Sequence, residues 1–180
     1  NSAGWGDSSD SDPVAYAHVT GGNGNAAGAD YAGVGGGHWN TVLGSYGHVN
    51  GGDSNIVYGQ GGTISGGFHN SAYGTQAHVS GGYYNAAFGD YAVVQGGSFS
   101  EASGDYSSVQ GGTSHVASGT NSLVNGGHAN VGTGEGGHVS GGMYNTASAD
   151  SAYAGGGYAN GAAPMSYPPI QYPQKPGQSG

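Results

Sequence analysis

The chain of 180 residues contains no cysteine and only one basic residue, Lys175, against ten acidic residues. The lack of cysteine excludes a disulfide framework and thiolate metal sites. The formal net charge of −9 disfavours nucleic acids and anionic membrane surfaces as partners, since both are negatively charged. No apolar run is long enough to span a membrane, and no Asn-x-Ser/Thr acceptor for N-glycosylation occurs.

The chain is instead dominated by a strict internal repeat. A unit of fifteen residues occurs ten times, without insertion or deletion, over residues 15–164. Segments 30–44, 45–59 and 75–89 align on a frame close to D-Y-A-x-V-x-G-G-x-x-N-x-A-x-G. Self-similarity at a short fixed period is typical of solenoids, in which each unit packs mainly against its neighbours. Positions in the unit are numbered 1 to 15 below, with Ala15 at position 1 of the first unit.

The pattern within the unit predicts two short strands per rung. Positions 3, 5, 11 and 13 are restricted and alternate with variable positions, as in strands with one buried face. Position 5 is valine in eight units, with Ile64 and Ala154 in the other two, and positions 7 and 8 are always glycine, which suits corners. Glycine, at 43 of 180 residues, argues against helices. We therefore expect an all-β fold: a narrow, two-sided parallel β-solenoid (β-roll) of ten 15-residue rungs.

Asparagine occupies position 11 in eight of the ten units. Stacked amides can hydrogen-bond along the axis of the solenoid, each NH2 group to the next side-chain carbonyl, so we expect a ladder at this position. Ser100 and His115 interrupt the series. Because a buried polar group without a partner costs about 1–3 kcal/mol, the sequence predicts a local irregularity at these two residues.

The two halves of the unit, A-x-V-x-G-G-x-x and N-x-A-x-G-x-x, resemble the head repeats of YadA-like trimeric autotransporter adhesins over residues 15–164. They are also similar to repeats of phage and bacterial fibre shafts. The resemblance implies a left-handed parallel β-roll and an exported, extracellular or cell-surface protein that adheres to other molecules. The unit here has fifteen residues, whereas the unit of those heads has fourteen.

Acidic residues recur at position 1, and neighbouring rungs should place Asp90 beside Asp105 and Glu135 beside Asp150. Like charges one rung apart, about 4.8 Å, repel each other. A Ca²⁺ ion could bridge each pair, which makes these four residues weak metal candidates. Solvated corner acids that limit lateral aggregation are the favoured interpretation, and no other cofactor is expected.

Histidines recur at position 4, where His18, His48 and His78 fall on alternate rungs and His138 follows later. Their Cα atoms should lie about 9–10 Å apart, too far for neighbours to share a zinc ion with bonds near 2.0–2.1 Å. A G-x-G-x-x-G match at 132–137 precedes no expected helix and carries no weight. Since no polar cluster interrupts the repeat to build a pocket, an enzyme is not expected.

Aromatic residues are frequent at positions expected to face outward. Exposed aromatic patches are typical of interfaces, and tyrosine suits one that is partly apolar and partly hydrated. The alternative is that these rings only stiffen the rod by stacking from rung to rung. The candidate interface residues are Tyr31, Tyr46, Tyr58, Tyr73, Tyr83, Tyr84, Phe88, Tyr91 and Tyr106 in the repeats, with Tyr167, next to Pro168, and Tyr172 beyond them.

The flanking segments differ from the repeats. Residues 1–14 are polar and acidic and are expected to form a cap or connector, and residues 165–180, with four prolines, an extended tail that docks on a neighbouring subunit. Together these features favour a non-enzymatic structural subunit of a self-assembling extracellular filament, with itself as partner. The alternative is a trimeric surface adhesin or phage-type fibre segment that binds a surface glycan or matrix protein. Ice binding is remote, because threonines such as Thr20, Thr41 and Thr63 fall on different positions of the unit.

Overall fold

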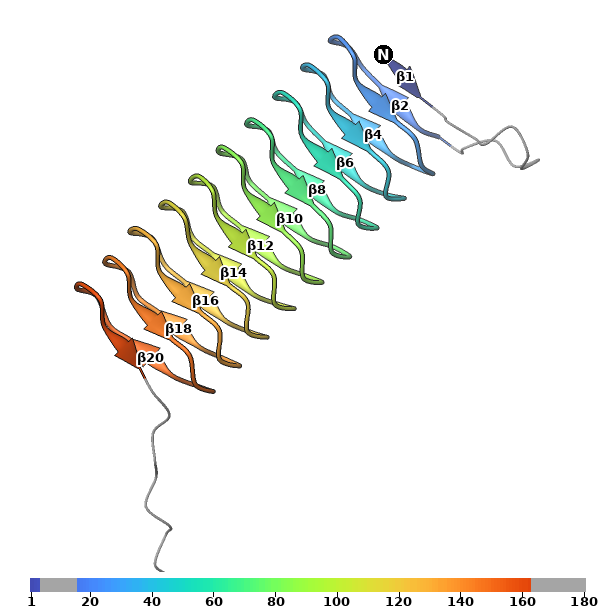
Figure 1. Cartoon of the computed structure of the whole chain (residues 1–180). Coiled ribbons are helices and arrows are strands. Elements are labelled where there is room, and N and C mark those ends of the chain that lie inside the picture. The colour runs from blue at the N-terminus through green and yellow to red at the C-terminus, as the bar shows by residue number, and fades with distance from the viewer. Residues whose placement is uncertain (4–15, 163–180) are drawn as a thin grey trace, which may run out of the picture.

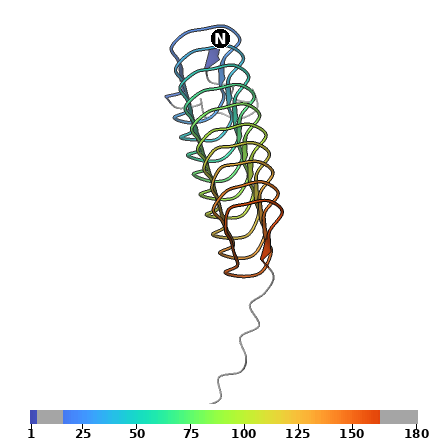
Figure 2. The same ribbon diagram turned by 90° about the vertical axis from the view of Figure 1, so that its left-hand side faces the viewer.

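The computed structural model describes residues 1–3 and 16–162, and these form a β-solenoid of two parallel sheets. Figure 1 shows the strands side by side along one rod, and Figure 2 shows the same coils stacked at regular intervals. Sheet A has eleven strands: β1 (Ser2–Ala3), β3 (Ala26–Ala27), β5 (Thr41–Val42), β7 (Ile56–Val57), β9 (Ser71–Ala72), β11 (Ala86–Ala87), β13 (Glu101–Ala102), β15 (Val116–Ala117), β17 (Val131–Gly132), β19 (Thr146–Ala147) and β21 (Gly161–Ala162). Sheet B has ten strands: β2 (His18–Val19), β4 (Gly33–Val34), β6 (His48–Val49), β8 (Thr63–Ile64), β10 (His78–Val79), β12 (Val93–Val94), β14 (Ser108–Val109), β16 (Leu123–Val124), β18 (His138–Val139) and β20 (Tyr153–Ala154).

The register of both sheets follows the sequence repeat. Each strand from β2 to β19 pairs with the equivalent strand fifteen residues later, as in Val49 with Ile64 and Ala87 with Ala102. The predicted all-β fold and the ten 15-residue rungs are therefore confirmed. At about 4.8 Å per rung, ten rungs make a rod of roughly 45–50 Å.

The N-terminus adds a strand that the repeat frame did not include. In β1, Ser2 pairs with Ala26 and Ala3 with Ala27, a separation of 24 residues. The sequence signal is the match of Asn1-Ser2-Ala3 to the N-x-A of positions 11 to 13. The first three residues of the predicted cap or connector thus belong to sheet A, and residues 4–14 and 165–180 lie outside the described residues.

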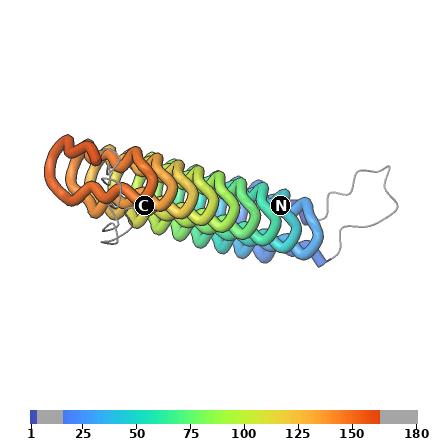
Figure 3. The backbone as a smooth tube through the Cα atoms, turned by 90° about the horizontal axis from the view of Figure 1, so that it is seen from below, coloured from blue at the N-terminus to red at the C-terminus, as the bar shows by residue number. Residues whose placement is uncertain are grey.

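The core is a narrow double column of small side chains. Position 5 contributes valines such as Val49 and Val94, and position 13 contributes mainly alanine; Val42 and Val57 also lie at position 13, and these four valines have no solvent exposure. This double column follows from the alternation in the sequence, because the positions on either side of these residues point outward. Figure 3 shows the backbone coils that stack along the rod and enclose the core.

The glycine positions serve two different purposes. Gly37, at position 8, has φ of +89° and lies so close to Gly52 that a Cβ would overlap its backbone oxygen. Gly44, at position 15, has no positive φ, but a Cβ there would overlap the backbone oxygen of Gly59. Position 8 therefore needs glycine for its positive φ and for close packing, whereas position 15 needs it for close packing alone.

The corners also contain left-handed residues that are not glycine. The turn from Gly44 to Gly47 is closed by a backbone hydrogen bond of 3.0 Å, and its third residue, Tyr46, has φ of +60°. Position 10 behaves alike, with φ of +53° at Trp39. This conformation costs roughly 1–2 kcal/mol for an L-residue. The sequence did not indicate it, because tyrosine and tryptophan are not residues that favour positive φ.

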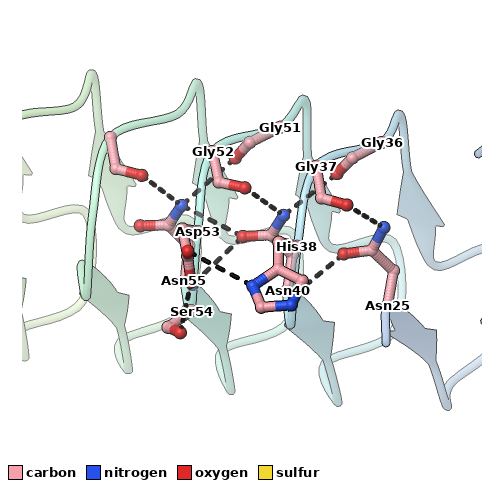
Figure 4. A network of polar contacts seen from close by, with 11 residues as sticks. Asn25, Gly36, Gly37, His38, Asn40, Gly51, Gly52, Asp53, Ser54 and Asn55 are labelled. Atoms are coloured by element: carbon pink, nitrogen blue, oxygen red, sulfur yellow. Dashed lines mark hydrogen bonds and ion pairs between the residues drawn. The ribbon is translucent and has the colours of Figure 1, made fainter. Parts of the chain in front are cut away.

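The asparagine ladder exists, but its bonds differ from the expected ones. In Figure 4 the Asn40 side-chain nitrogen donates to the carbonyl oxygens of Gly36 at 3.0 Å and Gly52 at 2.9 Å. The side-chain oxygen of Asn40 accepts the backbone N–H of Asn55 at 3.1 Å. Among the described residues, direct amide-to-amide bonds occur only from Asn55 to Asn40 and from Asn70 to Asn55, both 3.1 Å. The prediction of amide-to-amide bonds throughout is wrong, because the glycine carbonyls of the adjacent corners lie within reach of each amide.

The predicted irregularity at Ser100 and His115 is confined to side chains. The strands on both sides keep their register, with Glu101 paired to Val116. The backbone N–H of His115 reaches the Ser100 hydroxyl at only 3.4 Å, and His115 Nδ1 accepts the backbone N–H of Asn130 at 3.1 Å. His115 Nε2 is buried without a hydrogen-bond partner in the described structure. The ladder therefore continues through substitute acceptors and leaves one ring nitrogen unsatisfied.

Candidate interaction surface

The most regular exposed feature is a column of large apolar side chains at position 14, on the outer side of sheet A. Tyr58, Tyr73 and Phe88 follow β7, β9 and β11, and their ring centroids lie 4.7 and 4.6 Å apart. The interplanar angles of 6° and 10° make both pairs stacked. Leu43 occupies position 14 on the rung before that of Tyr58, and each of these four side chains is 41–48% exposed. We call these four residues the aromatic column.

Two further groups of aromatic side chains lie at the corners. At position 2, Tyr31 stacks on Tyr46 with centroids 4.8 Å apart, and Tyr91 on Tyr106 at 5.0 Å. Positions 9 and 10 at the other corner carry Phe68, Tyr83, Tyr84 and Phe99, in which Phe68 and Tyr83 are 5.4 Å apart. Rung-to-rung stacking therefore occurs at all three places.

Every candidate interface residue in the described part is exposed, but these residues do not form one continuous stripe. The structure divides them among three places: position 14 of rungs 3 to 5, position 2, and the corner at positions 9 and 10. The sequence repeat already implies this division, because each position of the unit points its side chain in its own direction. Tyr167 and Tyr172 lie outside the described residues.

The acidic residues at position 1 have a structural task that the sequence did not reveal. An Asp90 side-chain oxygen accepts the backbone N–H of Thr75 at 2.8 Å, and Asp105 accepts that of Asp90 at 3.0 Å. Asp150 likewise accepts the backbone N–H of Glu135 at 3.2 Å. The carboxylates thus satisfy corner N–H groups of the preceding rung. Among the described residues, no group of three or more histidine, aspartate and glutamate side chains could surround a metal ion.

A small polar cluster at position 9 also went unnoticed in the sequence. His38 Nδ1 lies 3.3 Å from an Asp53 oxygen, and the Ser54 hydroxyl donates to the other Asp53 oxygen at 2.6 Å (Figure 4). The Ser54 hydrogen bond, with smaller help from His38, lowers the pKa of Asp53. Because the carboxylate lies between serine and imidazole, the imidazole does not contact the hydroxyl, and the cluster lacks the serine–histidine–carboxylate order of a serine nucleophile.

At position 4, the rings of His18 and His48 lie closer together than the about 9–10 Å expected between their Cα atoms. His18 and His48 were predicted to be too far apart to share an ion. Their ring centroids lie 5.9 Å apart, because the residue between them on the middle rung is Gly33 and both rings lean over it. The shorter separation of the rings is compatible with the predicted Cα separation, because the glycine on the middle rung leaves space for both imidazoles.

No protein-family model matches the chain, and a search of curated proteins finds no significant similarity. Among the described residues, no helix is long and apolar enough to cross a membrane.

Proposed function

We propose that this chain is a non-enzymatic structural subunit of a self-assembling extracellular filament and that its rods associate side by side. The observation that carries the proposal is the aromatic column, in which four large apolar side chains on consecutive rungs are 41–48% exposed. A contiguous exposed apolar patch of this kind is typical of interaction surfaces.

The shape of the rod supports lateral association. Positions 12 and 14 flank the buried position 13, so Ile56 and Ala86 lie beside Tyr58 and Phe88 on the outer side of sheet A. The unbroken register keeps this surface straight over several rungs. A second copy can therefore place the same surface against it, and such a self-complementary contact needs no other partner.

The ends of the sheets offer a second means of joining rods. Among the described strands, none pairs with the outer edge of β20 or β21. An unpaired strand edge presents free N–H and C=O groups, which form a template for another chain. The proposed extracellular setting depends on the resemblance to adhesin head repeats.

The proposal is tested by removing the rings without disturbing the repeat. The variant Tyr58→Ser/Tyr73→Ser/Phe88→Ser places serine where Ser103, Ser118 and Ser148 already occupy position 14. We expect the wild type to form fibres in negative-stain electron microscopy and fast-sedimenting species in sedimentation velocity. The triple variant should remain in small species, with the circular dichroism spectrum of the wild type.

A matched control changes the same position outside the column, as Ser103→Ala/Ser118→Ala/Ser148→Ala, and should assemble like the wild type. A wild type that remains a monomer at all concentrations would contradict the proposal. Assembly of the triple variant to the same extent as the wild type would contradict the role of the aromatic column.

The exposed rings at position 10, in the corner formed by positions 9 and 10, favour one alternative function. Trp39 and Phe99 are 59% and 56% exposed, and such rings can stack on the apolar faces of sugars. A trimeric surface adhesin that binds a glycan or matrix protein would use them. A discrete particle of three chains by mass measurement, with glycan binding lost in Trp39→Ser/Phe99→Ser, would support this alternative over the filament.

A further inference from the structure

The two histidines on either side of Gly33 form a pair that no other part of position 4 repeats. His18 lies in β2, Gly33 in β4 and His48 in β6, so the imidazoles come from the first and third of three adjacent strands of sheet B. Their ring centroids are 5.9 Å apart with an interplanar angle of 42°.

Both imidazole rings border the gap above Gly33. A Cβ built on Gly33 would overlap Nδ1 of His48 and lie 2.7 Å from Cε1 of both His18 and His48. The His48 ring thus borders this space with Nδ1, and the His18 ring borders it with Cε1, the carbon between its two nitrogens. In the described structure no hydrogen bond engages a ring nitrogen of His18 or His48, so their lone pairs are available.

The next pair at the same position lacks this gap. Between His48 and His78 lies Thr63, whose hydroxyl is 2.6 Å from Nδ1 of His78. Nε2 of His78 is bonded to the Ser80 hydroxyl at 3.0 Å. The threonine side chain thus fills the space that Gly33 leaves open, and it engages the imidazole that would otherwise face the gap.

We propose that His18 and His48 bind one divalent transition-metal ion, such as Zn²⁺, Ni²⁺ or Cu²⁺, across Gly33. Metal–imidazole bonds of about 2.0–2.1 Å place the centroids of two rings on one ion about 5–6 Å apart, the separation found here. Neutral imidazole is a preferred ligand of these ions, and the net charge of −9 favours the approach of a cation. Two protein ligands leave the remaining coordination positions to water.

The test uses the full chain without a histidine tag, titrated with Zn²⁺ by calorimetry and by NMR of the imidazole ring protons. We expect one Zn²⁺ per chain, with the largest shifts at His18 and His48. The variants His48→Ser and Gly33→Thr should each lower the affinity at least tenfold. Both substitutions place residues that position 4 already holds, at Ser108 and Thr63, so the fold should be retained in circular dichroism.

Two further variants make the test specific to the gap. His78→Ser should bind Zn²⁺ like the wild type. In the His18→Ser background, Thr63→Gly should restore binding by opening the equivalent gap between His48 and His78. Absence of Zn²⁺ binding to the wild type, unchanged affinity in Gly33→Thr, or an equal loss in His78→Ser would overturn the proposal.

Discussion

At the scale of single residues, His115 at position 11 replaces the asparagine of the ladder with a side chain that fits it less well. Its neighbours in the ladder, such as Asn130, donate to two glycine carbonyls through the side-chain amide. The imidazole supplies an acceptor through Nδ1 but leaves Nε2 buried and unpaired. Burial disfavours the charged imidazole and lowers the pKa of His115 below its ordinary value of about 6.5.

We therefore predict that His115→Asn stabilises the protein by about 1 kcal/mol at pH 7, because the amide can bond to the carbonyls of Gly111 and Gly127. The unfolded state binds a proton on His115 more readily than the folded state, so the wild type loses stability as the pH falls from about 6.5 toward the folded-state pKa. The gain from the substitution should grow over this range. Urea unfolding at pH 7 and pH 5 measures both effects.

His78→Asn serves as the control for this prediction, since this histidine lies on the outer side of sheet B. It should change the unfolding free energy by less than about 0.5 kcal/mol at pH 7. If His115→Asn destabilises the protein, or if its effect does not depend on pH, the buried unpaired nitrogen of His115 does not lower the free energy of unfolding.

At the scale of the strand and corner, the sequence predicted the strands well and the corners only in part. Val49 and Ala87 could be assigned to the core because each belongs to a position that accepts only small or β-branched residues. The corner conformation at Tyr46 and Trp39 could not be predicted, because it is imposed by the neighbouring rungs against the local preference of the residue. The aromatic residues were correctly expected to be exposed, but their division among three places required the direction of each side chain.

The two consecutive glycines of each corner provide a matched test of this view. Gly37→Ala should destabilise the protein by about 3 kcal/mol or more, since φ is +89° and the methyl group would overlap the backbone of Gly52. Gly36→Ala places its methyl group in open space and should cost less than about 1 kcal/mol. Thermal and urea unfolding of the two variants gives the comparison. Equal destabilisation would show that the sterics of position 8 do not explain its strict glycine.

At the scale of the whole molecule, the rod is a sum of nearly equivalent rungs. Each rung contacts the one before and the one after it through the same strand pairs and the same ladder bonds. Stability in such a structure comes mainly from each rung and from its interfaces with its neighbours. No rung is therefore indispensable for the fold of the others.

Deleting residues 60–74 removes one whole unit and should leave a folded rod that is about 4.8 Å shorter. Deleting residues 60–73 removes one residue fewer and shifts every later position by one, which turns buried side chains outward at the junction. We expect a wild-type circular dichroism spectrum and cooperative unfolding for the first variant and a large loss of stability for the second. Small-angle scattering gives the length, and similar behaviour of both variants would contradict a strict fifteen-residue register.

The parallel pairing of all described strands gives the molecule a direction. The described sheets end in different strand edges, so a further copy can extend them only when it points the same way as the first. Such a head-to-tail junction leaves the N-terminal edge of one copy and the C-terminal edge of the other unpaired. The assembly therefore stays open and does not close on itself. Fibres grown from such junctions would have distinguishable ends, with their own rates of addition, and blocking one end would stop elongation there while the other continued.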